Sequence, residues 1–441
     1  MSKRMALTLL AGLTALPTTA PAAETVQDVL YYRPTETGFL MHWLVSARHP
    51  FDYAYLGATM NYDALTDAGG ECSVAPVAGM KAGRGNPWVE RHFRSTGWAR
   101  GVCEFPAASM HMTYTCVYIH CGRALGGLVL LTGSDDALRV VLNGSQVQKV
   151  QMQRGYNTDQ DRVAGITLKK GWNRLLCKVD DYMGGHGLAV RFKTADGKPV
   201  TDLKLSLAMP SKGATARFVD GAKYEADAAR LLKDAVRLRT EEGDLAAAEA
   251  ACRKVAVRYP RSRAAAEALY HAGSFLRQAG KPDDALKTLD DLLRRYPYAK
   301  WAEDALLAKA RVLHAHRRDA EAAGKALGEL LDRFAKSALV PEALLLLADL
   351  KTGGKRLDEA DAVLARVRRE FPDTVEAVQA LEALADNQQA RKQPNEAKEL
   401  WRQVLKEAKT LSEGKYVWYV NVQAVLKKVA DSARAKLQGR K

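Results

Sequence analysis

The sequence predicts a protein of two parts, an antiparallel β-sandwich followed by an α-helical repeat array. Two patterns in the 441 residues predict this division. Up to residue 210, short apolar runs alternate with glycine-containing turns and no helical period intervenes, which is typical of antiparallel sandwiches. Farther along, Ala, Leu, Arg and Glu dominate with a helical period, and a set of alanines recurs every 37 or 38 residues. The predicted boundaries are 24–210 for the sandwich, 211–221 for a linker, 222–412 for the repeats and 413–441 for a basic capping helix.

Residues 1–23 have the composition of a cleavable export signal. Lys3 and Arg4 precede a 12-residue apolar stretch that is too short to span a bilayer, and small residues follow. We therefore expect cleavage near Ala22/Ala23, a periplasmic or secreted protein, and no transmembrane span. The alternative is a disordered or buried N-terminal helix.

The charge balance limits the classes of partner. Lys and Arg number 66 against 51 Asp and Glu, which gives a net charge of +15, and residues 391–441 contribute +8 of it. This basic end would attract an acidic partner, an anionic polymer or lipid head groups, although a solvated basic face is the commoner explanation. Nucleic acid is not expected for an exported chain that lacks a base-stacking platform.

Six cysteines suit an oxidising compartment. No C-x-x-C pair is present, so a zinc site is not expected. If Cys116 and Cys121 share a strand, their spacing places them on opposite faces, where they would not bridge each other. Buried free thiols and one or two disulfides remain alternatives.

The strands of the first part are predicted from apolar runs that end in turn residues. Asn143-Gly144 is a strong signal for a two-residue hairpin. The runs cover residues 125–132, 138–142, 163–168, 174–179, 188–193 and 203–207.

Three segments carry a resemblance to a known family. Residues 133–136 (Gly-Ser-Asp-Asp), 140–144 and 166–178 look like the core of galactose-binding-like jelly-roll modules, including sugar-binding domains of the protective-antigen type. The resemblance spans about residues 30 to 207 and implies a jelly-roll sandwich. In the sugar-binding relatives an adjacent Asp pair holds a Ca²⁺ ion that grips sugar hydroxyls, and Asp135 and Asp136 match that pair by position. The alternative is that Asp135 caps its own turn while Asp136 is solvated.

Two further residues complete the glycan or calcium candidates. These are Asn143 and Trp172. The Trp172 ring would stack on a sugar or pack beneath the sheet. Apart from Ca²⁺, we expect no cofactor and no metal. The chain has no G-x-S-x-G, H-E-x-x-H or phosphate-loop motif. The sequence therefore favours binding over catalysis, and the protein is not expected to be an enzyme.

The second part contains a ladder of small and large side chains. Small residues let two helices approach closely, and large apolar residues four and seven positions later fill the interface. The small positions are Ala248, Ala285, Ala323, Ala360 and Ala397. The large positions are Cys252, Leu289, Leu327, Leu364 and Trp401, followed by Val255, Leu292, Leu330, Val367 and Val404.

This ladder strongly resembles the tetratricopeptide repeat. Its period of 37 or 38 residues is similar to that of periplasmic envelope proteins of this family, and it implies about five helix hairpins stacked into a solenoid. Arg311 and Ala335 mark the third repeat as the least regular. The resemblance implies a protein or peptide partner, and helix periodicity places Tyr270, Ser274 and Arg277 as groove candidates.

Together these patterns predict an exported, non-catalytic scaffold. The solenoid would bind a protein partner, and the sandwich would hold a glycan or a second surface in the cell envelope. Two alternatives stay open: an accessory carbohydrate-binding protein, and an enzyme whose site lies between the two parts.

Overall fold

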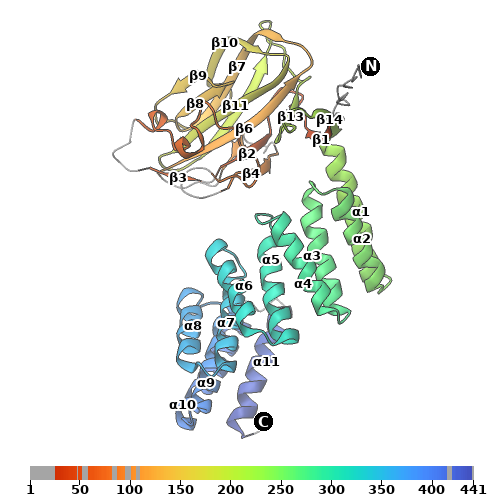
Figure 1. Cartoon of the computed structure of the whole chain (residues 1–441). Helices are drawn as coiled ribbons and strands as arrows, with labels where there is room; N and C mark the ends of the chain where they lie inside the picture. The colour runs from red at the N-terminus through yellow and green to blue at the C-terminus, as the bar shows by residue number, and fades with distance from the viewer. Residues whose placement is uncertain are drawn as a thin grey trace, which may run out of the picture. The chain divides into compact units, whose positions relative to one another are not determined.

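The computed structural model describes residues 25–46, 48–51, 58–81, 87–94, 101–105, 110–414 and 420–439. The chain forms two compact units, Met1–Gly221 and Ala222–Lys441 (Figure 1). The predicted export signal lies outside the described residues. Of the helices that the structure describes, none has the length and hydropathy that a membrane span requires.

The first unit contains two antiparallel sheets that share an apolar core. This confirms the antiparallel sheet region expected from the alternating runs and turns. The smaller sheet has the order β10 (Asp161–Leu168), β7 (Leu125–Asp135), β12 (Gly187–Lys193), β5 (Cys103–Glu104). The larger sheet has the order β4 (Val89–His92), β2 (His42–Val45), β6 (His111–Cys121), β11 (Gly171–Asp181), β8 (Leu138–Leu142), β9 (Ser145–Val150), with β3 (His49–Pro50) and β13 (Lys204–Ser206) also paired to β6.

The larger sheet is buried on both faces. Successive side chains of a strand point to opposite faces, so neighbours along β6 enter different cores. Val117 and Ile119 join the core between the sheets, whereas Tyr114 and Tyr118 join a second core that includes Leu65 of the segment 58–81. That segment carries two short 3₁₀ helices, η2 (Thr59–Asn61) and η3 (Thr66–Ala68). It therefore covers a sheet face that would otherwise expose apolar side chains.

The cysteines of the structure are free thiols, and all except Cys72 are buried. Cys116 lies in the outer core and Cys121 in the core between the sheets, as their spacing predicts. Burial raises the pKa of the Cys116 thiol to about 12. These thiols therefore act as small apolar side chains rather than as reactive groups.

The segment 211–221, expected as a linker, contains strand β14 (Thr215–Asp220). It pairs in parallel with β1 (Val26–Tyr31) as a two-stranded sheet. The helix α1 begins directly after it at Gly221, where an added Cβ would lie 2.5 Å from the ring of Tyr32. The charged residues of this strand and the Pro and Gly of the preceding residues 210–214 favoured a linker over a strand.

The second unit consists of five helix hairpins and a final helix (Figure 1). We call the first helix of each hairpin its A helix and the second its B helix. The A helices are α1 (Gly221–Thr240), α3 (Arg263–Gln278), α5 (Trp301–Val312), α7 (Val340–Gly353) and α9 (Val375–Ala390). The B helices are α2 (Leu245–Arg258), α4 (Pro282–Arg295), α6 (Ala320–Arg333), α8 (Leu357–Glu370) and α10 (Pro394–Glu413).

The predicted ladder is buried in the stack of hairpins. All five ladder alanines are 0% exposed, and the large residues that follow them are at most 5% exposed. Ala272 and Ala310 of the A helices are also 0% exposed, so facing helices meet at small side chains. This confirms the helical repeat array.

The turn inside each hairpin holds one residue with positive φ. These residues lie five positions before the five ladder alanines and so repeat with the same spacing. They are Gly243 (φ 71°), Gly280 (φ 72°), Arg318 (φ 52°), Lys355 (φ 58°) and Lys392 (φ 62°). In the third hairpin a π-helical turn, η4 (Leu313–Arg317), precedes it. This turn agrees with the irregularity expected of that repeat.

The last hairpin is covered by the helix α11 (Val420–Leu437). Leu426, Val429 and Ala433 join the core of α9 and α10. The Lys436 ammonium lies 2.9 Å from an oxygen of Glu382 on α9. The helix thus supplies the end cover that a stacked array needs.

Candidate functional site

The predicted acidic pair lies at the end of β7. The Asp136 carboxylate accepts hydrogen bonds from the backbone N–H of Arg154, at 2.8 Å, and from that of Tyr182, at 2.9 Å. Burial raises the pKa of Asp135 to about 6, and the charges of Asp136 and Asp181 raise it further. Asp136 therefore ties two loops to the end of the sandwich.

These residues do not fit a calcium site. Ca²⁺ takes about six to eight oxygen ligands. Within the described ranges, no group of three or more His, Cys, Asp or Glu side chains is arranged to hold a metal ion. Both Asp136 oxygens already accept backbone hydrogen bonds. No role of the protein is therefore derived through Ca²⁺.

Asn143 and Trp172 lie in the larger sheet, at the end opposite to the one where Asp136 contacts Asp180 of β11. Asn143, with φ 52°, forms the predicted hairpin turn, and its Oδ1 accepts from the backbone N–H of Arg174 at 3.0 Å. The ring of Trp172 lies 5.1 Å from that of His120 and 5.8 Å from that of Phe218 in β14. Because Trp172 and Asp181 are nine residues apart in β11, the two groups are separated by about 30 Å. The four glycan candidates thus do not form one site.

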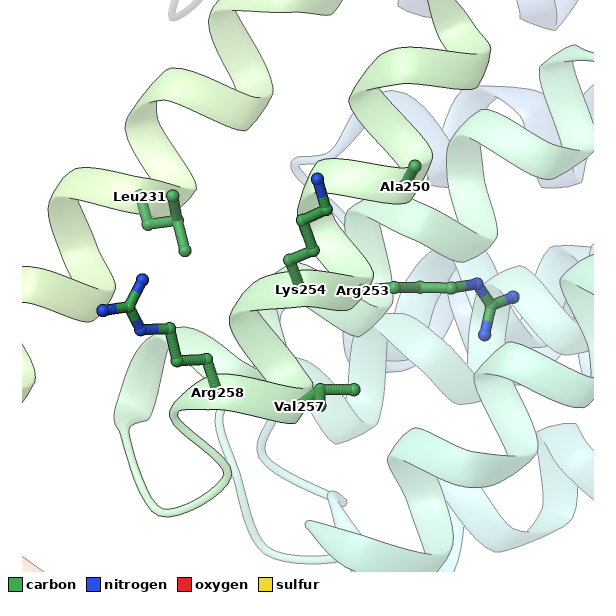
Figure 2. A pocket seen from close by; sticks show the side chains of 6 residues that line it. All are labelled: Leu231, Ala250, Arg253, Lys254, Val257 and Arg258. Atoms are coloured by element: carbon green, nitrogen blue, oxygen red, sulfur yellow. The ribbon is translucent and has the colours of Figure 1, made fainter.

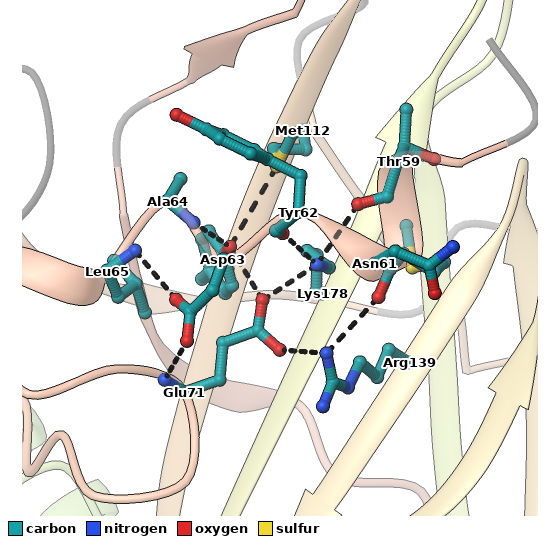
Figure 3. Close-up of polar contacts among 12 residues, drawn as sticks. Thr59, Asn61, Tyr62, Asp63, Ala64, Leu65, Glu71, Met112, Arg139 and Lys178 are labelled. Carbon is teal, nitrogen blue, oxygen red and sulfur yellow. Dashed lines mark hydrogen bonds and ion pairs between the residues drawn. The ribbon is translucent and has the colours of Figure 1, made fainter. Parts of the chain in front are cut away.

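A buried polar cluster joins the segment 58–81 to the larger sheet (Figure 3). Glu71 accepts from Lys178 Nζ at 2.7 Å and from the Tyr114 hydroxyl at 2.8 Å. Its second oxygen forms an ion pair with Arg139 at 3.0 Å. Burial lowers the pKa of Lys178, and Glu71 opposes that shift. Glu71 and Lys178 are each 1% exposed, so the cluster holds the structure together and does not offer a reactive group.

No sequence pattern predicted this cluster. Its members come from distant strands and loops, with Glu71 and Lys178 separated by 107 positions. One signal was present: Lys178 is a charge inside the apolar run 174–179. A lysine at such a position requires a buried acceptor.

The predicted groove residues lie on one face of α3. Tyr270, Ser274 and Arg277 are separated by four and three positions, which is the spacing of neighbours on a helix surface. Ser274 accepts a hydrogen bond from Gln278 Nε2 at 3.3 Å. Arg277 has no ion pair with any residue that the structure describes. The structure therefore places all three side chains together, outside the ladder that holds the hairpins.

This face continues from each A helix to the next, and we call it the A-helix face. Its side chains connect helices that are separate in the sequence. The contacts are Arg239 with Gln278 (3.0 Å), the rings of Tyr270 and Trp301 (4.9 Å), Arg311 with Glu342, His314 with Asp349 (2.9 Å), and Thr352 with Asn387 (3.2 Å).

An aromatic and cationic cluster occupies the face between α3 and α5. Tyr270 and Trp301 are stacked with an interplanar angle of 28°. Burial raises the pKa of Tyr270, with a further contribution from Asp304. Burial lowers the pKa of the Arg311 guanidinium, and the nearby Arg277 lowers it further. The guanidinium group of Arg277, and that of Arg311 in its ion pair with Glu342, thus lie near a stacked aromatic pair.

Comparison with known proteins agrees with this arrangement of helices. Residues 267–297 and 342–374 match the tetratricopeptide repeat family. The two segments cover the hairpins α3–α4 and α7–α8, and the irregular third hairpin lies between them. Both matched segments lie within the predicted repeat region 222–412 and cover part of it.

Several solved structures are similar to part of the chain. The crystal structure of MamA is 18% identical, covers 41% of this chain and 96% of that chain, and has a TM-score of 0.34. A tetratricopeptide repeat protein from Parabacteroides merdae ATCC 43184 is 17% identical over 48% of this chain and 86% of that chain, at a TM-score of 0.36. YrrB, described as a TPR protein with an unusual peptide-binding site, is 18% identical. The match covers 42% of this chain and 89% of that chain and has a TM-score of 0.33. No curated protein sequence matches the chain.

Proposed function

We propose that the protein is a non-catalytic scaffold that binds a segment of a partner protein on the A-helix face. The observation that carries this proposal is the cluster of Tyr270, Trp301 and Arg277 on helices whose other faces are used up by the stack. The buried ladder holds the hairpins together, and Tyr270 and Trp301 pack against that core on one side while each side chain stays partly exposed on the A-helix face. The tetratricopeptide match supports a role in protein interaction.

The proposal is tested by selecting peptides on the full chain. Peptides from a displayed library are eluted, and the affinity of the best binder is measured by fluorescence anisotropy. Tyr270→Ala and Arg277→Glu are expected to weaken binding by about tenfold or more each. Lys287→Glu on α4 is the matched control, because it reverses one exposed charge away from this face. Equal affinities for all variants would refute the A-helix face as the binding site.

For the sandwich we propose a second interaction surface rather than a glycan site. The four glycan candidates lie at two separate places on the sandwich, and within the described residues no third His, Cys, Asp or Glu side chain is arranged with the acidic pair to hold a metal ion. A glycan array with and without added Ca²⁺ tests this view. We expect no calcium-dependent sugar signal, whereas a specific one would favour an accessory carbohydrate-binding protein.

We also propose that the chain is exported to the periplasm or beyond the cell. Support comes from the basic, apolar and small-residue pattern of residues 1–23. Expression in a bacterial host with cell fractionation and N-terminal sequencing tests this step. A protein that begins near Ala22/Ala23 outside the cytoplasm supports export, and an uncut cytoplasmic protein refutes it.

A further inference from the structure

The first hairpin of the second unit contains a hollow between its two helices. We call it the α1–α2 hollow; its volume is about 380 Å³ and its lining includes Leu231 of α1 and Lys254, Val257 and Arg258 of α2. Figure 2 shows Leu231 facing Lys254 and Arg258 across the space. Ala250 and Arg253 complete the lining, which contains three cations and no acidic residue.

The other four hairpins serve as internal controls for the charges. Lys254 and Arg258 are four residues apart on α2, and neither forms an ion pair within the described part of the chain. In each later hairpin the same two positions hold at least one acid, and their side chains contact each other. These pairs are Asp291 with Arg295 (3.1 Å), Glu329 with Arg333, Arg366 with Glu370 (3.0 Å), and Gln403 with Glu407 (2.8 Å).

The apolar residues of the lining also differ from the residues at the equivalent positions of the later hairpins. Val257 is 77% exposed, and charged residues take its position in the other B helices: Arg294, Asp332, Arg369 and Lys406. Leu231 is half-buried. Its counterparts are at most 1% exposed, because a preceding hairpin covers each of them: Ala268, Leu306, Ala343 and Ala380. The first hairpin thus exposes an apolar surface at two positions that are covered by a neighbouring hairpin or carry a charge in the later hairpins.

This combination does not favour the stability of the free hairpin. Two like charges at i and i+4 repel each other, and an exposed valine has low helix propensity. An anionic amphipathic ligand relieves the repulsion, because its carboxylates pair with the cations, and an apolar group of the ligand covers the exposed Val257.

We propose that the α1–α2 hollow is a second docking surface and that its occupant is an acidic, amphipathic segment of a partner protein. One apolar side chain of the segment lies between Leu231 and Val257. Flanking carboxylates pair with Lys254 and Arg258. The surface includes the B helix α2 and none of Tyr270, Ser274 and Arg277. This proposal therefore adds a second partner to the proposed scaffold, and its failure would leave the proposed binding on the A-helix face untouched.

Charge and shape favour this occupant over two others. A second copy that stacked end to end would present α11, which carries Lys427, Lys428 and Arg434 and would be repelled. A bilayer receives protruding apolar side chains, whereas this lining forms a depression. A hollow instead accepts a side chain that projects from a peptide.

The test uses the full chain and a defined probe. The probe is a fluorescein-labelled peptide of about 14 residues with leucines at i, i+3, i+4 and i+7 and glutamates elsewhere. A peptide with lysine in place of each glutamate is its reference. We expect the glutamate peptide to bind at least about tenfold more tightly in an anisotropy titration. Equal binding of the two peptides, or no binding, would overturn the proposal.

Variants locate the bound probe. The double variant Lys254→Glu/Arg258→Glu is expected to lose about tenfold or more in affinity for the glutamate peptide. Val257→Arg, which installs the residue of the second hairpin, is expected to lose about fivefold. Lys287→Glu/Lys325→Glu reverses two exposed charges on other B helices and is expected to bind as the parent does. Equal losses in the control, with unchanged circular dichroism, would overturn the location.

Two further measurements distinguish the other occupants. In a Cys72→Ser background, Val257→Cys should react with a soluble maleimide and be protected by the glutamate peptide. Protection without peptide would show that the chain itself fills the hollow and would overturn the proposal. Sedimentation with phosphatidylserine vesicles that depends on Lys254 and Arg258, without peptide binding, would show that the occupant is a membrane and would overturn the proposal.

A Tyr270→Ala variant that keeps the probe bound shows that this surface is independent of the A-helix face.

Discussion

Glu71 and Lys178 form an ion pair beneath the segment 58–81, with 2.7 Å between Oε1 and Nζ. Arg139 contacts the other carboxylate oxygen of Glu71. One buried acid is therefore the counter-ion of two cations, and its loss is expected to cost more than the loss of either cation alone.

Glu71→Ala is expected to destabilise the sandwich by about 3–5 kcal/mol, because it leaves buried cations without their partner. Lys178→Met should cost less, since Arg139 still pairs with Glu71. The double variant Glu71→Leu/Lys178→Met should recover most of the loss. Urea denaturation gives the free energies of unfolding, and a Glu71→Ala protein as stable as Lys178→Met would contradict this ranking.

The stability of the sandwich is expected to rise when the pH falls from 7 to 5. Burial raises the pKa of Asp180 to about 6, from 3.8 for the free carboxyl group, although Thr59 and Ala137 donate hydrogen bonds to it. The folded state therefore binds a proton that the unfolded state releases, and this contribution is lost as the pH rises through 6. Its size over this window is on the order of 1 kcal/mol.

Asp180→Asn tests that prediction. An amide does not titrate, so the variant should show a smaller change of unfolding free energy between pH 7 and pH 5. Its Oδ1 can still accept from Ala137 N–H, which lies 2.6 Å away in the parent. An unchanged pH profile in the variant would assign the effect to other groups.

Enlarging a ladder alanine is expected to force neighbouring hairpins apart. Ala360→Leu places extra atoms at a site that is 0% exposed, and should destabilise the solenoid by about 1–3 kcal/mol. Ala362→Leu on the exposed face of the same helix is the control, and should be almost neutral. Thermal denaturation followed by far-UV circular dichroism compares the two. Equal melting temperatures would contradict the close approach of the helices.

The solenoid could be predicted in detail because its signal is local and repeated. Each hairpin places a small residue and two large ones at fixed spacings, and five copies make the pattern unambiguous. The same helix period places Tyr270, Ser274 and Arg277 on one face of α3, and their role in a binding groove stays a prediction.

The sandwich could be predicted only as a set of strands and turns. Alternation gave β8 and the Asn143-Gly144 hairpin. It did not predict that the segment 58–81 covers the outer face of the larger sheet, because Glu71 and Lys178 meet only after the strands have paired. It also did not separate the acidic pair from Trp172, since sequence spacing does not say at which end of a sheet a residue lies.

The hairpin turns carry a conformational cost that can be measured directly. Lys355 has φ 58°, at the position where Gly243 and Gly280 have similar angles. A side chain in this left-handed region costs about 1 kcal/mol, which glycine avoids at the expense of its own entropy. Lys355→Gly is thus expected to stabilise the solenoid by about 0.5–1 kcal/mol, while Lys355→Ala keeps the strain and stays near the parent.

The reverse substitution, from glycine to alanine, measures the free-energy cost of the left-handed backbone conformation alone. An added Cβ on Gly280 meets nothing within 4 Å, so Gly280→Ala suffers no clash and should still lose about 1 kcal/mol. Urea denaturation of the two Lys355 variants and Gly280→Ala forms the comparison. A Lys355→Gly protein no more stable than Lys355→Ala would mean that the turn does not require a left-handed residue. The repeat of positive φ angles would then lose its physical basis.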